Sequence, residues 1–272
     1  SQFHYLENIR TNDFIRKQIM PTILLSRVIF QQLLTAIMLI FCFFQPAIAH
    51  TVIEPPQVTE GKTSNNHVVI THGCGDNPVI GHSIVFPDGV DSTITVNGNP
   101  HTGSIDEFLQ NWGGAIQFVQ DRSLFSEQDR KIDANGNTVG FWFGGGRTLA
   151  PYAYGRMPFI SSAILFVSES CATTVRFAIA GADVCTITGA DGMNSDNAVS
   201  FWTPAVGSKF DGLPGGHAYD FPIFLSFNRD LETNPLPETC AGEQQVFVRP
   251  SAAQVDRDMP IIFNGTQVWP QP

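Results

Sequence analysis

Positive charge and long apolar segments are scarce in this sequence. Only 15 of its 272 residues are Lys or Arg, against 25 that are Asp or Glu. Nucleic-acid binding requires clustered basic side chains that contact phosphates, so the composition argues against a nucleic-acid partner. Beyond residue 49 no apolar run approaches the roughly 20 residues of a membrane helix, so we expect no membrane span there.

Several short catalytic and metal-binding motifs are also missing. The sequence contains no H-E-x-x-H, G-x-S-x-G or P-loop pattern, no H-x-H pair and no C-x-x-C pair. These absences argue against enzymes that carry their metal ligands, nucleophile or phosphate loop in one short segment. They leave open a Ser-His-Asp set, because such residues come together in space from distant parts of a chain.

Residues 1–49 have the organisation of a secretory leader. An uncharged apolar run occupies 33–44, Arg27 precedes it, and Ala47-Ile48-Ala49 fits the small-residue rule for signal peptidase. We therefore expect cleavage after Ala49, with residues 1–19 as an upstream extension before Met20. The mature part, 50–272, is expected to be a single domain in the periplasm, outside the cell or on its surface.

Cleavage after Ala49 would make His50 the first residue of the mature chain. A free α-amine titrates near about 7.7, so a metal ion can displace its proton at neutral pH. The amine and ring nitrogens of one histidine then chelate a single ion, which suits copper(II). The acidic balance of 50–272, with 23 Asp and Glu against 11 Lys and Arg, also attracts cations weakly. The sequence therefore predicts a copper site at His50, which a leader cut at any other bond would remove.

Cysteine usage fits an exported protein. Cys42 lies in the leader, which leaves Cys74, Cys171, Cys185 and Cys240. An even count in an exported chain is typical of two disulfides. Of the three connectivities we favour Cys171–Cys185, because the segment between these residues has the pattern of a strand and a turn. Cys74–Cys240 would then be the second bridge, and thiolate ligation of a metal is the alternative use.

Alternating apolar residues predict many short strands. The alternation is clearest in 172–181 and 219–228, and Asn97-Gly98 and Asn135-Gly136 are hairpin-turn signals. Further strand-like runs occupy 66–72, 80–86, 92–96, 114–119, 138–143, 160–167 and 244–249. This spacing predicts an all-β fold, an antiparallel β-sandwich, with the 22 Phe supplying most of its core.

Helical signals are few. Ser104-Ile105-Asp106-Glu107 has the pattern of a capping box and predicts a short helix reaching about Trp112. Ser251 opens a similar segment. We therefore expect only short helical insertions in the sandwich.

Two further histidines are candidate copper ligands. His72 leaves a predicted strand into the Gly-rich segment 73–76, where it either lies near a metal or hydrogen-bonds the loop. His217 follows two glycines, where the backbone can approach another group closely, and is the better candidate for a second imidazole. His82 and His101 have the pattern of ordinary surface or loop residues.

The first part of the mature chain resembles a known family. The relevant segments are His50-Thr51-Val52-Ile53-Glu54-Pro55, Glu60-Gly61-Lys62, His72-Gly73-Cys74 and Phe86-Pro87-Asp88-Gly89-Val90. In order and spacing they resemble the start of the YcnI-type periplasmic copper-binding domain over about 50–90. The resemblance fades after residue 115, and this chain is longer than the usual domain of that family.

The resemblance implies a β-sandwich with a copper(II) site built from an N-terminal histidine, a carboxylate and a nearby tryptophan. His50 matches the histidine, and Trp112-Gly113-Gly114 resembles a W-x-G-G-like segment of the family. The carboxylate has no clear match, and Glu54 and Glu60 are candidates by nearness alone. The ligand set expected from the sequence is therefore His50 with Glu54, Trp112, His72 and His217 as further candidates.

These observations favour an exported protein that holds one copper ion for storage, delivery or scavenging, alone or with a copper-exchange partner protein. A first alternative is an enzyme like the lytic polysaccharide monooxygenases, which also begin with histidine and need a second imidazole, from His72, His101 or His217. A second is a structural or adhesive surface domain without metal, which a different leader cleavage site would favour.

Overall fold

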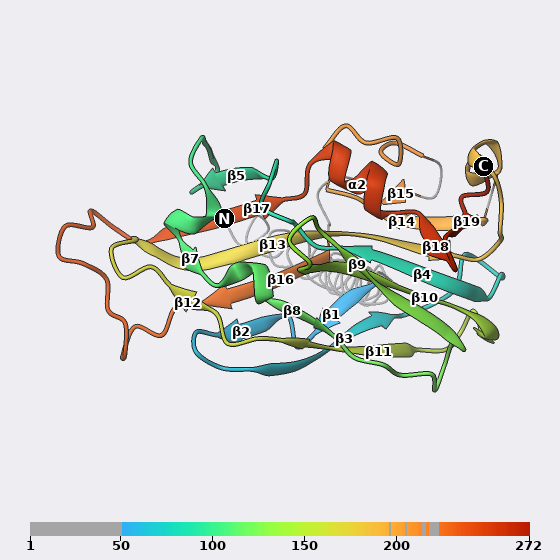
Figure 1. Ribbon diagram of the computed structural model, residues 1–272, viewed down its shortest axis with the longest axis horizontal. Helices are drawn as coiled ribbons and strands as arrows, with labels where there is room; N and C mark the ends of the chain where they lie inside the picture. Colours follow the sequence, from blue (N-terminus) through green and yellow to red (C-terminus); the bar gives the residue numbers. More distant parts are fainter. Residues whose placement is uncertain (1–50, 196, 205, 214–215, 218–222) are drawn as a thin grey trace, which may run out of the picture. The chain divides into compact units, whose positions relative to one another are not determined.

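The computed structural model describes residues 51–272 except 196, 205, 214–215 and 218–222 (Figure 1). The predicted leader and His50 lie outside the described residues. Ala49–Pro272 form one compact unit. Most of its regular structure is β-strand, which confirms the all-β prediction.

A four-stranded antiparallel sheet forms one layer of the sandwich. Its strand order is β1 (Val52–Glu54), β3 (Ser64–Ile70), β11 (Gly155–Ser161) and β8 (Ile116–Phe118). The register pairs Val52 with Val69, and Val69 with Arg156. This sheet carries the first described residues of the chain on its edge strand.

A larger sheet of eleven strands forms the other layer. Its main path is β6 (Asn99–His101), β5 (Thr93–Val96), β17 (Gln244–Arg249), β13 (Ala172–Val184), β4 (Val79–Val85), β10 (Thr138–Leu149) and β9 (Glu127–Ile132). Four strands join it off this path: β2 (Gln57–Thr59), β16 (Ile223–Asn228), β14 (Val199–Trp202) and β15 (Gly216–His217). Pairing is mostly antiparallel, but three pairs are parallel: β13 with β17, β14 with β15, and β16 with β2. The long strand β13, yellow in Figure 1, therefore connects both halves of the sheet.

Smaller elements complete the fold. Two-stranded sheets pair β7 (Leu109–Gln110) with β12 (Leu165–Phe166) and β18 (Ile261–Phe263) with β19 (Thr266–Trp269). The helical segments are α2 (Ala252–Asp258) and the single turns η1 (Ile105–Glu107), η2 (Trp112–Gly114) and η3 (Ala190–Asn194). No helix within the described ranges is both long and apolar enough to cross a membrane.

Alternation along the large sheet divides the interior into two hydrophobic clusters. Ile84, Phe141 and Phe143 face the small sheet, whereas Val85 and Trp142 face the other way. Successive strand residues point to opposite faces, so one strand serves both clusters. The first cluster lies between the layers and is rich in Phe, as predicted. The second is covered by α2, β18 and β19.

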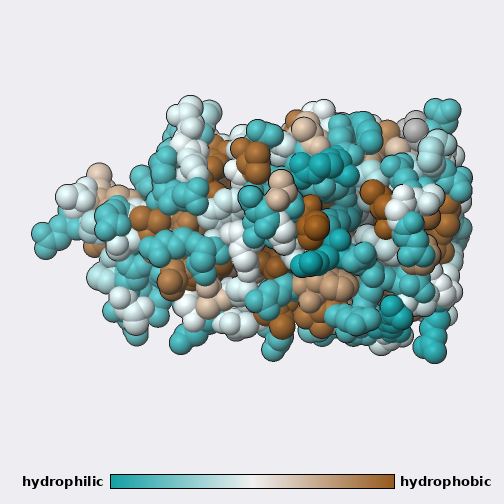
Figure 2. All heavy atoms as spheres, viewed as in Figure 1, coloured by the Kyte–Doolittle hydropathy of each residue, from teal (hydrophilic) through white to brown (hydrophobic). Residues whose placement is uncertain are grey.

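Figure 2 shows hydrophilic and hydrophobic side chains interspersed on the face that it draws. The side chains buried beneath are large and apolar: Phe86, Phe141, Phe143, Phe159, Phe177 and Phe227 are almost completely inaccessible in the first cluster. Burying such a ring contributes on the order of 1.5–3 kcal/mol, so the interior supplies most of the stabilisation.

The local signals in the sequence are partly confirmed. Asn97 and Gly98 both have positive φ, as the turn between β5 and β6 requires. The capping box at Ser104 is present, but it opens only the single turn η1, because β7 follows at Leu109. The run 160–167 was expected to be one strand; instead β11 ends at Ser161 and β12 begins at Leu165.

The strand β13 has a disulfide-bonded cysteine immediately before it and another immediately after it. The bridges are Cys74–Cys185 and Cys171–Cys240. Two disulfides are confirmed, but the favoured pairing of Cys171 with Cys185 is wrong. The thirteen residues of β13 run between these two cysteines, so they lie at opposite ends of one strand and cannot meet.

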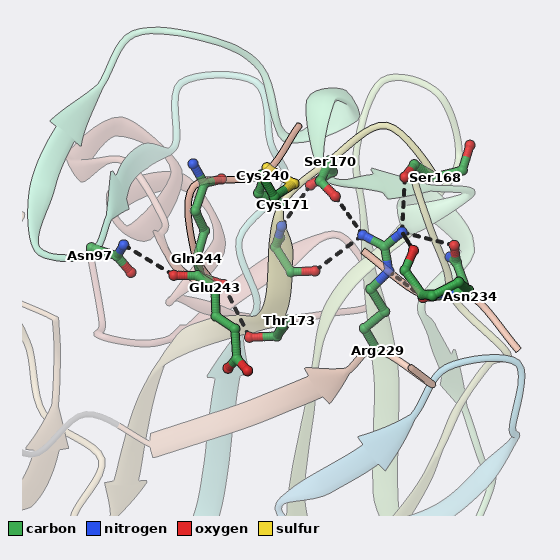
Figure 3. Close-up of a disulfide and its surroundings, with 12 residues drawn as sticks. Asn97, Ser168, Ser170, Cys171, Thr173, Arg229, Asn234, Cys240, Glu243 and Gln244 are labelled. Atoms are coloured by element: carbon green, nitrogen blue, oxygen red, sulfur yellow. Dashed lines mark hydrogen bonds between the residues drawn. A yellow bond between two sulfur atoms is a disulfide. The ribbon is translucent and has the colours of Figure 1, made fainter. Parts of the chain in front are cut away.

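Figure 3 shows the surroundings of the Cys171–Cys240 bridge. The guanidinium of Arg229 donates to the carbonyl oxygens of Ser170 at 2.6 Å and Ser168 at 2.9 Å. It also donates to the side-chain and main-chain oxygens of Asn234, both at 2.8 Å. Arg229 therefore ties the segment before β13 to the loop after β16.

Candidate functional site

A buried chain of hydrogen bonds starts at Thr51, the first described residue. The Thr51 hydroxyl donates to Asp183 Oδ2 at 2.9 Å, and His82 Nδ1 lies 2.6 Å from Asp183 Oδ1. The exposed fractions are 2% for Thr51, 1% for Asp183 and 0% for His82. One carboxylate thus joins the start of the described chain to an imidazole in the interior.

The sheet register explains why Asp183 and His82 meet. Strands β13 and β4 are antiparallel neighbours, and Asp183 is paired with His82. Directly paired residues place their side chains on the same face. His82 is also paired with Phe143 of β10, and Phe143 belongs to the cluster between the layers. The pair is therefore in the interior between the two sheets.

The two ring nitrogens of His82 differ in their surroundings. Nδ1 is bonded to Asp183, whereas Nε2 is buried and has no hydrogen-bond partner among the residues described. With Nδ1 as the donor to the carboxylate, Nε2 carries the lone pair. This is the arrangement in which histidine binds metals, with a carboxylate fixing the tautomer from behind.

The Cys74–Cys185 bridge lies next to this pair. Cys185 follows Asp183 by two residues, and Cys74 Sγ lies 3.6 Å from the Asp183 carbonyl oxygen. The Cys74 amide donates to Cys185 Sγ at 3.2 Å. The bridge therefore fixes the segment 72–74 against the end of β13.

His72 lies at the same end of the sandwich as Thr51. Strand β3 ends at Ile70, and Val69 is paired with Val52, so the chain beyond Ile70 continues past the first residues of β1. His72 is half-buried, and its Nδ1 donates to the carbonyl oxygen of Gly73. The structure therefore contains the loop hydrogen bond that the sequence allowed for His72, in the neighbourhood of Thr51.

For His217 the structure describes only the backbone. His217 is paired with Trp202, and Trp202 is paired with Gly181, two residues before Asp183. The register therefore brings the His217 backbone to the part of the large sheet that contains Asp183.

Glu54 and Glu60 have partners elsewhere. Glu54 Oε2 forms an ion pair of 2.7 Å with Arg156, and both side chains are largely exposed. Glu60 is buried and accepts hydrogen bonds from the Phe166 amide at 2.7 Å, the Asp230 amide at 3.0 Å and the Asn234 side chain at 2.9 Å. Glu60 is therefore occupied by loops of the fold.

Trp112 also has a separate environment. Its indole Nε1 donates to Asp106 at 2.6 Å, and its ring packs against Gly89, where an added Cβ would lie 2.3 Å from the ring. Ile116 follows Trp112 by four residues, and it lies level with Ser64 in the small sheet because both are paired with Ser161. Val52, which follows Thr51, is paired instead with Val69, near the other end of β3. Ser64 and Val69 are five residue steps apart along β3, which corresponds to roughly 17 Å. The structure therefore does not bring Trp112 to Thr51.

The described part of the chain contains a paired imidazole and carboxylate but no group that could by itself hold a metal ion. Within it, no group of three or more His, Cys, Asp or Glu side chains is arranged to hold a metal ion. His82 and Asp183 provide an oriented imidazole and its carboxylate, and His50 lies one peptide bond before Thr51, outside the described residues.

Sequence reasoning missed His82 and Asp183. His82 was interpreted as a surface or loop residue, but it is completely buried. The signal that could have found it is a histidine inside the apolar run 79–86, together with an aspartate at the end of the apolar run 175–184. A polar residue in a strand buried on both faces needs a partner, and these two supply one another.

Comparisons with known proteins identify no family for this chain. No family model and no curated protein matches the chain. Some similarity is found to a solved structure described as "AvmM Catalyzes Macrocyclization in Alchivemycin A Biosynthesis". It is 13% identical, with 66% of this chain and 89% of that chain covered, and the TM-score is 0.20. A similarity at this level supports no inference about function.

Proposed function

We propose that this chain is an exported protein that binds one copper ion at the amine and imidazole of His50, for copper storage, delivery or scavenging. The observation that carries the proposal is the anchoring of Thr51. Its hydroxyl is bonded to a buried carboxylate that also holds an imidazole, whose second ring nitrogen has no partner in the described chain. The residue immediately before Thr51 is the histidine expected at the mature N-terminus.

The chemistry of this region suits copper(II). A histidine amine and imidazole form a chelate, and nitrogen donors are strongly favoured by copper(II) among the divalent first-row metals. His72 and the oriented imidazole of His82 lie at the same end of the sandwich. Two disulfides also fit a protein that works in an oxidising compartment outside the cytosol.

Burial favours a carrier over a polysaccharide-cleaving enzyme. An enzyme that oxidises an insoluble polymer needs its copper on an open face. Here Thr51, Asp183 and His82 are each at most 2% exposed. A metal held beside them would be shielded from a solid substrate and would exchange with a partner protein by way of the N-terminus.

The test begins with the exported protein, whose N-terminus and intact mass should identify His50 as the first residue. Copper(II) titration should give one tight site per chain. His50→Ala, or one Gly inserted before His50, should abolish tight binding, because each removes part of the chelate. His101→Ala is the matched control, since His101 pairs with Glu107 at the edge strand β6. A different N-terminus, or tight copper binding by the Gly-extended protein, would contradict the proposal.

A second measurement separates carrier from enzyme. The copper-loaded protein with ascorbate and oxygen should not cleave chitin or cellulose. Copper-dependent release of oxidised oligosaccharides would replace the carrier proposal with the monooxygenase alternative.

A further inference from the structure

We infer that the outer face of β5, β17 and β13 binds an acidic saccharide, a chain of hexuronic acids, whose carboxylates are held by Arg176 and Arg249. These three strands are neighbours in the large sheet (Figure 1). Their outer face contains a groove of about 350 Å³. The inference goes beyond the proposed function, because it concerns a ligand other than copper and the opposite face of the sheet from Asp183.

The outer face of β13 is covered along only part of its length. Phe177 belongs to the cluster between the layers, so its neighbour Arg176 points outward. Further along the strand, Ala180 and Ala182 are buried in the second cluster, which α2, β18 and β19 cover. Arg176, in contrast, is exposed, and Thr174 is half-buried. The half of β13 that carries Arg176 is therefore accessible to a ligand from outside.

The strand register makes the two arginines diagonal neighbours. Arg176 is paired with Phe247 in the parallel pair of β13 and β17. Arg249 follows Phe247 by two residues, so it lies on the same face of the sheet. Diagonal neighbours on adjacent strands are about 7–8 Å apart, a distance that two long side chains can span toward one ligand. Both arginines line the groove.

Two phenylalanine rings hold the guanidinium groups in place. The guanidinium carbon of Arg176 lies 5.1 Å from the ring centroid of Phe224, and that of Arg249 lies 5.0 Å from the ring centroid of Phe247. The two rings also pack edge to face, with their centroids 5.5 Å apart. An arginine stacked on an aromatic ring keeps its planar fork of N–H donors for a ligand. Both guanidinium groups are therefore oriented before a ligand arrives.

Most donors of these two arginines are not used by the described residues. Arg176 Nε donates to the Ser226 hydroxyl at 3.2 Å, whereas Arg249 Nε is buried and has no partner there. Neither arginine forms an ion pair within the described ranges, although Arg156 and Arg257 are paired with carboxylates. Buried donors without a partner are uncommon and call for an explanation. In a chain of net charge −10, two oriented guanidinium groups without carboxylate partners form a site for an anion from outside.

The chemistry of the groove favours a carboxylate carried by a saccharide. Arginine binds carboxylates through two parallel N–H···O bonds. The other side chains of the groove supply hydroxyl and amide groups, which exchange hydrogen bonds with sugar hydroxyls. They belong to Thr95, Asn97, Thr174 and Gln245, and the described lining contains no Asp or Glu.

An acidic peptide fits this face less well than a saccharide. Extended peptides bind by adding a strand to a free sheet edge, where main-chain groups are available to them. The groove instead lies over β5, β17 and β13, each of which is already paired with a strand on both sides. A hexuronate chain needs only the side chains that the groove presents.

The experiment is calorimetric titration of the protein with a short oligogalacturonate at low salt, because salt screens contacts between exposed charges. The anionic oligosaccharide should bind. Its fully methyl-esterified form keeps most of the sugar hydroxyls but has no charge, so it should bind at least about 10-fold more weakly. Arg176→Met and Arg249→Met should each weaken binding of the anionic form by about 10-fold or more, because each removes charged donors but keeps much of the apolar stem.

Two further variants serve as controls. Arg130→Met, on β9 at the opposite end of the main strand path, removes the same charge and should leave the affinity unchanged. Arg176→Lys keeps the charge but loses the planar fork, so its affinity should lie between those of the wild type and Arg176→Met.

The results that would overturn the inference are distinct. Absence of oligogalacturonate binding by the wild type, or equal binding of the esterified form, would do so without any variant. An equal loss in Arg130→Met would show a general effect of net charge in place of a site. A glutamate oligomer bound as tightly as the oligogalacturonate would replace the saccharide with an acidic peptide. None of these outcomes affects copper binding at His50, which is tested separately.

Discussion

The two ends of β13 differ in how completely their buried polar groups are paired. At the end that begins with the Cys171–Cys240 bridge, Arg229 donates to several acceptor groups (Figure 3). Glu60 at the same end accepts hydrogen bonds from two amides and one side chain. At the end that leads to the Cys74–Cys185 bridge, both carboxylate oxygens of Asp183 are bonded, but His82 Nε2 has no partner in the described chain. Both regions combine a disulfide with a buried charged side chain.

The difference is the one expected between a network that serves only the fold and a region that can offer a group to a ligand. A fully satisfied buried network makes a rigid connection between loops and has no remaining group to offer a ligand. A network that stops at one unpartnered imidazole nitrogen has a group to offer. The same strand therefore serves stability at one end and, as we propose, copper at the other.

Removing each disulfide by paired Cys→Ser substitution is the strongest test of this contrast. The bridges span sequence separations of 111 and 69 residues, so each loss should reduce the free energy of unfolding by roughly 4–5 kcal/mol. Chemical denaturation measures this loss. Copper affinity should fall only when Cys74 and Cys185 are replaced, because that bridge anchors the strand end beside Asp183. Equal copper affinity in the two variants would contradict the proposed difference between the two ends of β13.

Arg229→Met should destabilise the protein by about 3 kcal/mol, because several buried carbonyl oxygens lose a charged donor. Thermal or denaturant unfolding provides the measurement, and Arg122→Met, away from this network, is the control. The folded variant should bind copper with unchanged affinity. Weaker copper binding would show that the two ends of β13 are coupled.

Lys131 is a third side chain whose contacts can be tested, and its replacement should have a smaller effect on the stability of the protein. Its amine donates to the hydroxyl of Ser83 and to the carbonyl oxygens of Asp258 and Met259. Burial lowers the pKa of the Lys131 amine to about 7, and the nearby Asp258 offsets part of that shift. The amine would titrate near about 10.4 in the unfolded chain.

Between these two pKa values the unfolded chain binds more protons than the folded protein, so stability rises with pH. From about pH 7 to about pH 9 the wild type should gain stability relative to Lys131→Met, by no more than about 1.4 kcal/mol per pH unit. Denaturant unfolding at several pH values gives the difference. The exposed Lys62→Met variant should show no such trend; a flat difference for Lys131→Met would mean that the amine stays charged.

The strands with strong alternation could be predicted from the sequence. The run 244–249 coincides with β17, and 172–181 lies within β13. The short edge strands β1 and β2 escaped prediction because three residues carry too little pattern. Gly155-Arg156-Met157-Pro158 in β11 escaped because glycine and proline are turn signals in most contexts.

The candidate site was less accessible to sequence reasoning. His50 and His72 could be chosen because each belongs to a recognisable local pattern. His82 and Asp183 lie 101 residues apart, and only the pairing of β4 with β13 brings them together. The disulfide pairing failed for the same reason, because the length and direction of β13 decide which cysteines can meet.

The arrangement of the two bridges also determines how the chain responds to proteases. Cys74 is joined to Cys185 and Cys171 to Cys240, so the two closed segments overlap along β13. A single cut at any peptide bond between Cys74 and Cys240 falls inside at least one of these segments. The two pieces therefore remain covalently connected until a reductant is added. An exported protein of this design can be nicked in a surface loop and still remain a single covalent unit.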